Sequence, residues 1–101
     1  MLIYTAIDDK KKARKIAKKL LAKHLAACIQ IQKIKSLYKW QGKLCDEKEF
    51  LLCIKTAPKK RKKLCKKLRQ MHSYDTPEIA CISVKHWDKK YKKWLDKAIR
   101  K

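Results

Sequence analysis

The chain has 101 residues, enough for one domain and too few for a second hydrophobic core. It carries 30 Lys and Arg against 9 Asp and Glu, which gives a formal net charge of +21. No apolar run approaches the length of a membrane span, so we expect no membrane helix. The first residues lack the pattern of a signal peptide, and we expect none.

The five cysteines, at positions 28, 45, 53, 65 and 81, are odd in number and include no C-x-x-C pair. Most of them lie inside apolar segments. This usage is typical of free thiols in a reducing compartment, and we therefore expect a cytoplasmic location. A structural zinc site is not expected at these spacings.

The first part of the chain predicts a strand, a helix and a second strand. Residues 2–7 are apolar and rich in strand formers, and Asp8 and Asp9 follow as helix-capping and first-turn residues. Apolar positions then recur at helical spacing: Ala13, Ile16, Ala17, Leu20, Leu21 and His24. Residues 26–40 have extended character. Their apolar positions change strand face midway, which predicts a β-bulge near residues 32–33.

The middle of the chain predicts a long hairpin. Residues 41–43 contain the only glycine and form the turn, and residues 44–57 form the third strand. Both strands have about 14 residues against a usual 5–6, so the hairpin must project beyond its own core. Its end carries apolar side chains, which are Leu37, Tyr38 and Trp40. An exposed apolar end and open strand edges favour a closed symmetric oligomer.

The last part predicts a helix, a strand and a final helix. Pro58 opens the second helix, and Asp88 caps the final one. The second helix has the apolar face Leu64, Cys65, Leu68 and Met71, and the final helix has the stripe Tyr91, Trp94, Leu95, Ala98 and Ile99. The last strand is predicted over residues 78–84. The alternative to an oligomer is that the final helix folds back over the hairpin end, whereas an oligomer would use Trp94 as a further interface anchor.

The order β-α-β-β-α-β plus a helix predicts an α+β fold of the ferredoxin-like type, with residues 1–101 as one domain. Right-handed crossovers place the first and third strands in the centre of the sheet and both main helices on one face.

His72 is the candidate metal ligand, with Glu78 nearby in sequence. Imidazole with carboxylate suits divalent ions such as Cu(II) or Zn(II), bound weakly by so small a ligand set. The alternative is structural, because a histidine at a helix C-terminus stabilises the dipole. No cofactor is required by any motif. A single glycine excludes glycine-rich nucleotide loops, and no nucleophile–base pattern is visible, so no enzyme is predicted.

Five segments, in order and at matching spacing, resemble the CutA (divalent-cation tolerance) family. They are Leu25-Ala26-Ala27-Cys28-Ile29, Ser36-Leu37-Tyr38-Lys39-Trp40-Gln41-Gly42-Lys43, Leu51-Leu52-Cys53-Ile54-Lys55-Thr56, His72-Ser73-Tyr74-Asp75-Thr76-Pro77-Glu78-Ile79, and Tyr91 with Trp94. The resemblance implies a cytosolic homotrimer of ferredoxin-like subunits with a role linked to copper and other divalent metals. Ser73 departs from the family's proline, and Tyr4 stands where some members carry a cysteine proposed as a metal ligand.

Two alternative functions use the same order of elements. A basic RRM-like nucleic-acid-binding module would need a glycine and aromatic residues in its third strand, where this chain has Asp46-Glu47-Lys48-Glu49-Phe50. The lysines occur on every predicted helix, which favours a solvated surface that binds nucleic acid non-specifically at low salt. A PII-like signalling trimer would need a long nucleotide-binding loop, for which the predicted three-residue turn has no room.

Overall fold

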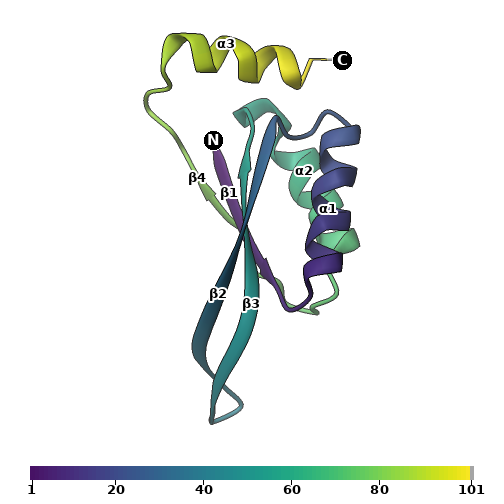
Figure 1. Cartoon of the computed structure of the whole chain (residues 1–101), viewed down its shortest axis with the longest axis vertical. Coiled ribbons are helices and arrows are strands. Elements are labelled where there is room, and N and C mark those ends of the chain that lie inside the picture. Colours follow the sequence, from purple (N-terminus) through teal and green to yellow (C-terminus); the bar gives the residue numbers. More distant parts are fainter. Residues whose placement is uncertain (101) are drawn as a thin grey trace.

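The computed structural model describes residues 1–100. Its elements are β1 (Leu2–Ile7), α1 (Lys10–Ala22), β2 (Cys28–Trp40), β3 (Lys43–Lys55), the short 3-10 helix η1 (Pro58–Lys60), α2 (Arg61–Met71), β4 (Ala80–Ile82) and α3 (Lys89–Ala98). The strands form one antiparallel sheet in the order β2-β3-β1-β4, with α1 and α2 on one face (Figure 1). This is the predicted ferredoxin-like arrangement, with the first and third strands central. None of the helices in this part of the chain has the length and apolar character needed to cross a membrane.

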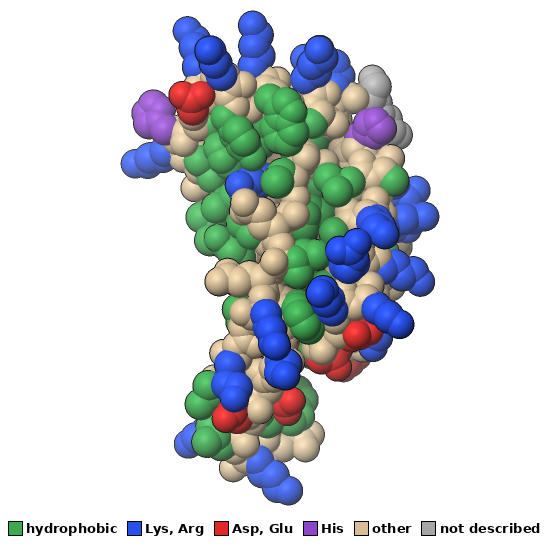
Figure 2. Space-filling view, in the orientation of Figure 1, with side chains coloured by type: hydrophobic (Ala, Val, Ile, Leu, Met, Phe, Trp, Pro, Cys, Tyr) green, Lys and Arg blue, Asp and Glu red, His purple; other side chains and the backbone are tan. Residues whose placement is uncertain are grey.

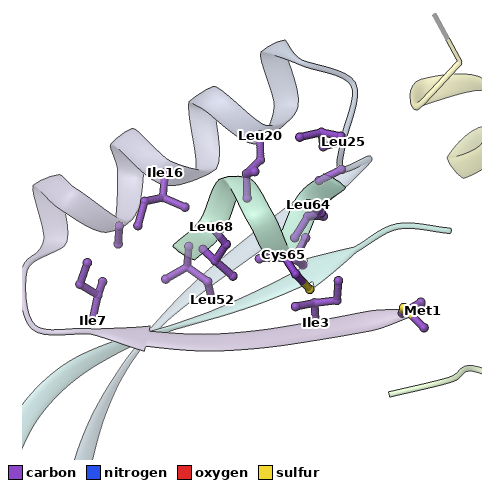
Figure 3. Close-up of a cluster of buried hydrophobic side chains, with 13 residues drawn as sticks. Met1, Ile3, Ile7, Ile16, Leu20, Leu25, Leu52, Leu64, Cys65 and Leu68 are labelled. Carbon is purple, nitrogen blue, oxygen red and sulfur yellow. The ribbon is translucent and has the colours of Figure 1, made fainter. Parts of the chain in front are cut away.

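The core lies between the sheet and the two main helices (Figure 3). Alternate residues of a strand face the same side of a sheet, and Ile3, Leu52 and Ile54 all face the helices with no exposed surface. The helices contribute Leu20 and Leu64, which are also fully buried. Burying each such side chain stabilises the fold by about 1.5–3 kcal/mol, so this layer holds α1 and α2 against the sheet.

The hairpin of β2 and β3 is paired in one unbroken register, from Cys28 opposite Lys55 to Trp40 opposite Lys43. The predicted bulge near residues 32–33 is therefore wrong. Ile31 faces the helices, whereas Ile34 faces the opposite side, beyond the point where the strand leaves the core. The apolar pattern changes face because the surroundings of the strand change, and no residue is inserted.

The hairpin turn has two residues instead of the predicted three. Gln41 and Gly42 both have positive φ, at 50° and 76°, as a type I′ turn requires. The twist of this turn matches the right-handed twist of the strands on either side, so the two strands stay paired to their last residues.

Three further boundaries differ from the prediction. The last strand, β4, is shorter than residues 78–84, because it pairs with β1 only from Leu2 to Tyr4. The first helix ends at Ala22, so His24, with φ of 58°, lies outside it. Leu21 is 41% exposed and does not belong to the buried face.

The predicted helix caps are confirmed in part. Asp88 accepts hydrogen bonds from the backbone N–H groups of Lys90 and Tyr91, as expected at the start of α3. Asp9 takes the capping position of α1 without a side-chain hydrogen bond, and the first turn of α1 holds no acidic residue. The capping stabilisation expected there is absent from this helix.

Two buried threonines provide a matched test of the core. The Thr5 hydroxyl is fully buried without a hydrogen-bond partner, whereas the Thr56 hydroxyl donates to the Leu25 carbonyl at 2.7 Å. We expect Thr5→Val to raise the free energy of unfolding by about 1 kcal/mol, and Thr56→Val to lower it by a similar amount. Urea unfolding followed by circular dichroism measures both. Equal effects of the two substitutions would contradict this assignment of the hydrogen bonds.

A candidate site in an acidic cleft

A cleft of about 580 Å³ runs along the hairpin toward the body of the subunit. Four segments line it: the end of β1, the end of β2, the middle of β3, and the connector between α2 and β4. The lining residues are Ala6, Asp8, Tyr38, Trp40, Glu47, Glu49, Tyr74, Asp75, Thr76 and Glu78. Five of the nine acidic residues of the chain therefore line this one cleft.

The charge of the cleft is opposite to that of the chain. Among the residues that the structure describes, no lysine or arginine lines it. The two ion pairs within residues 1–100, Lys35 with Asp46 and Lys92 with Asp96, use carboxylates outside the lining. Figure 2 shows basic side chains spread over both the body and the hairpin, with a few acidic side chains on the hairpin and at the adjoining end of the body. A recess lined by one sign of charge focuses the field, so this cleft favours cations.

Glu49 and Tyr74 connect the hairpin to the connector. The Tyr74 hydroxyl donates to Glu49 Oε2 at 2.7 Å, and the Glu49 side chain is only 7% exposed. Partial burial, the hydrogen bond and the nearby Glu49 charge raise the pKa of Tyr74 above its ordinary value. The bond holds one wall of the cleft against the other.

The raised pKa of Tyr74 predicts a pH dependence. The folded chain holds the phenol proton more tightly than the unfolded chain, so this stabilisation is complete below pH 10 and is lost as the pH rises further. We expect the difference in the free energy of unfolding between wild type and Tyr74→Phe to shrink as the pH rises above 10. The slope should stay below roughly 1.4 kcal/mol per pH unit, which is the value when the folded chain binds one whole proton more than the unfolded chain. Urea unfolding at pH 8 to 11.5 measures it. A difference that grows with pH would contradict the assignment.

His72, the predicted metal ligand, uses both ring nitrogens in hydrogen bonds. The Tyr74 backbone N–H donates to Nδ1 at 3.1 Å, so Nε2 carries the proton and donates to the Ala6 carbonyl at 2.9 Å. His72 is 8% exposed and is not among the residues that line the cleft. Glu78, its predicted partner, does line it. Within residues 1–100, no three potential ligand side chains lie close enough to hold one metal ion.

The four predicted interface residues are all exposed but do not lie together. Leu37, Tyr38 and Trp40 lie at the end of the hairpin, at 64%, 43% and 58% exposure. Trp94, at 50%, lies on α3 at the opposite end of the molecule (Figure 1). The alternative in which the final helix covers the hairpin end is wrong, because α3 packs through Leu95 on a cluster with Ala27, Ala57 and Ile99 instead. Most of the hairpin end is left open to solvent.

Several residues of these surfaces were not among the predicted site residues. Leu44 is the most exposed large apolar side chain, at 70%, and extends the apolar end of the hairpin. Glu47 and Glu49 were considered only as evidence against an RNA-binding third strand, and not as cleft residues. The available signal was an acidic run on a strand of an otherwise basic chain. Asp8 and the connector lie close to this strand only in the folded chain. No short sequence pattern indicates that proximity.

Residues 1–98 match the family model described as CutA1 divalent ion tolerance protein. The chain belongs to this family. The divalent-cation tolerance protein CutA of Thermotoga maritima is 35% identical over 99 residues, which cover 98% of each chain. A solved structure of CutA from Archaeoglobus fulgidus superposes with a TM-score of 0.95 at 36% identity, covering 98% of this chain and 97% of that one. The RRM-like and PII-like alternatives find no support in these matches.

The names of the CutA relatives correct one prediction. The Archaeoglobus structure is described as a periplasmic protein. A rice relative, 32% identical over 101 residues that cover 99% of this chain and 57% of that protein, is named as chloroplastic. The prediction of a cytoplasmic location is therefore wrong, because members of this family are named for other compartments. The relatives are named for tolerance of divalent cations and not for a catalysed reaction.

Proposed function

We propose that this chain acts in divalent-cation tolerance by binding divalent cations weakly in the acidic cleft of a homotrimer, with residues 1–101 working as one domain. The observation that carries the proposal is the gathering of five of nine carboxylates in one cleft, on a chain of charge +21. No basic residue among those that the structure describes lines this cleft. A surface of this kind attracts cations and discourages polyanions.

The donor set suits a loosely held ion. Carboxylate oxygens are ligands for hard divalent cations, whereas copper and zinc favour imidazole and thiolate. Residues 1–100 of a single chain do not bring three ligands together, so the cleft in one subunit supports low affinity. Glu78 is a direct ligand candidate in this proposal. His72 supports the same wall through its bonds to Tyr74 and Ala6, and would become a copper or zinc ligand only after giving up one of them.

The trimer is proposed from the two exposed apolar ends of the subunit. The hairpin end and the α3 surface around Trp94 lie at opposite ends of a molecule 45 Å long. Contact between two different surfaces of neighbouring copies is heterologous, and it closes into a ring when the rotation fits. Such a ring covers the hairpin end. Because Tyr38 and Trp40 at this end also line the cleft, residues of a second chain would then lie beside it.

We infer that the chain works by binding and not by catalysis, and that it needs no resident cofactor. The Glu49–Tyr74 bond and the His72 bonds hold walls in place. Burial and the bond to Glu49 raise the pKa of Tyr74, so its hydroxyl stays protonated and is a poor nucleophile. Contact with nucleic acid is proposed only as a non-specific property of the lysines at low salt.

Calorimetric titration with Mn²⁺, Cu²⁺ and Zn²⁺ tests the proposal. We expect Glu47→Gln/Glu49→Gln to lower the affinity for the ion that binds by about tenfold or more, because one of the two carboxylates is buried at the cleft wall. The matched control is Asp9→Asn/Asp96→Asn, which removes the same charge outside the cleft and should bind like wild type. Equal losses in both double variants would show a general charge effect and would contradict the site.

A further inference from the structure

Two of the five cysteines lie in direct contact although 16 residues separate them in the chain. Cys65 Sγ on α2 and Cys81 Sγ on β4 are 3.7 Å apart. No other pair of cysteine sulfurs within residues 1–100 is in such contact, and all five thiols are free. Cys81 pairs with Ile3 across the sheet, which directs its side chain to the helix side, where α2 lies.

The two thiols differ in accessibility. Cys65 is buried, at 6% exposure, whereas Cys81 is exposed on a three-residue edge strand. Burial raises the pKa of the Cys65 thiol above its ordinary value, and Arg69 and Arg61, one turn away on either side along α2, oppose that shift. An exposed thiol beside a buried one and two guanidinium groups is an arrangement suited to an anionic disulfide reagent, since its carboxylates would lie against the arginines.

We propose that Cys65 and Cys81 form a reversible intramolecular disulfide by exchange with a small anionic disulfide of the oxidised glutathione class. The Cys81 thiolate attacks one sulfur of the reagent, and the first thiolate of the reagent leaves and takes up a proton. The Cys65 thiolate then attacks the Cys81 sulfur, and the second thiolate of the reagent leaves. In sum, two protein thiols and one disulfide give one protein disulfide and two small thiols.

The geometry favours completion of the second step. A disulfide bond is about 2.05 Å long, so the sulfurs must approach by roughly 1.7 Å from their present separation. Cys81 lies on the outer strand of the sheet, where side-chain and strand adjustment meet little packing. Because the second thiol already touches the first, the mixed disulfide resolves within the chain at high effective concentration.

Closing this bond would tie β4 to α2 and would enclose the connector between them. That connector holds Tyr74, Asp75, Thr76 and Glu78, which form one wall of the acidic cleft. The modification would therefore restrict the motion of that wall. The proposal concerns the thiols alone, and it stands or fails independently of cation binding in the cleft.

The test treats the native protein with oxidised glutathione, blocks remaining thiols with an alkylating reagent and maps peptides by mass spectrometry. We expect the count of free thiols to fall from five to three, with a Cys65–Cys81 cross-link and a mass loss of about 2 Da. Hydrogen exchange should then slow across residues 72–79 in the oxidised protein. Cys28→Ser is the matched control and should form the same cross-link.

Single variants resolve the order of the two steps. In Cys65→Ala, the reaction should stop at a glutathione adduct on Cys81. In Cys81→Ser, the buried Cys65 should form neither an adduct nor a cross-link. The peptide map of the wild type decides the matter even where a variant folds poorly. A stable adduct on wild-type Cys81 without a cross-link, or links to Cys28, Cys45 or Cys53, would overturn the proposal.

Discussion

Replacing Leu37 or Leu44 with lysine is expected to convert the proposed trimer into a monomer. The two residues are diagonal neighbours on one face of the hairpin end, where Leu37 lies opposite Asp46 and Leu44 opposite Lys39. At 64% and 70% exposure they have almost no cover within their own chain. Burial of each leucine in an assembly contributes about 1.5–3 kcal/mol per subunit, and a lysine there would bury a charge instead.

Light scattering on a sizing column measures this change. The mass should fall from three times the 12.0 kDa of the chain to the mass of a single chain. Leu21→Lys is the matched control, because it adds the same charge at a 41% exposed leucine on α1, away from the hairpin. Dissociation of the control as well would show repulsion between highly charged subunits. A hairpin variant that keeps the wild-type mass would remove the hairpin end from the interface.

His72→Ala is expected to lower the free energy of unfolding by about 2–4 kcal/mol in the presence of a chelator. The substitution leaves the buried Ala6 carbonyl and the Tyr74 N–H without their partner and opens a cavity at the end of α2. The effect should appear without metal, because it comes from hydrogen bonds within the chain.

His86→Ala is the matched control, since His86 is exposed and its removal should change stability by less than about 0.5 kcal/mol. Urea unfolding with and without added Cu²⁺ separates two roles of His72. A loss seen only with copper present would identify His72 as a ligand. An equal loss in both conditions would identify it as a positioning residue for the connector.

The hairpin was predictable from local pattern because its determinants are local. Two long extended segments joined by Gln41 and Gly42 can pair in only one way when the turn has two residues of positive φ. The predicted bulge near residues 32–33 is wrong because the change of apolar face does not come from an inserted residue. Ile34 lies beyond the helices, and where the core ends along a strand depends on the packing of other elements.

The cleft was not predictable in the same way. Asp8, Glu47 and Glu78 come from segments far apart in the sequence, and each alone fits an ordinary surface residue. His72 and Glu78 appeared to be partners because six positions separate them, but the structure turns the His72 ring toward Ala6 and leaves Glu78 in the cleft. Sequence proximity does not fix which way a side chain points once a helix has ended.

By itself, the sequence determined the order of elements, the ferredoxin-like sheet and the family, because apolar periodicity, turn residues and motif spacing are properties of short segments. Only the tertiary structure decided that the carboxylates of a strongly basic chain meet in one cleft, that Cys65 touches Cys81, and that α3 leaves the hairpin end open. These outcomes depend on long-range packing, in which strand pairing and helix docking bring together residues that have no local preference for each other.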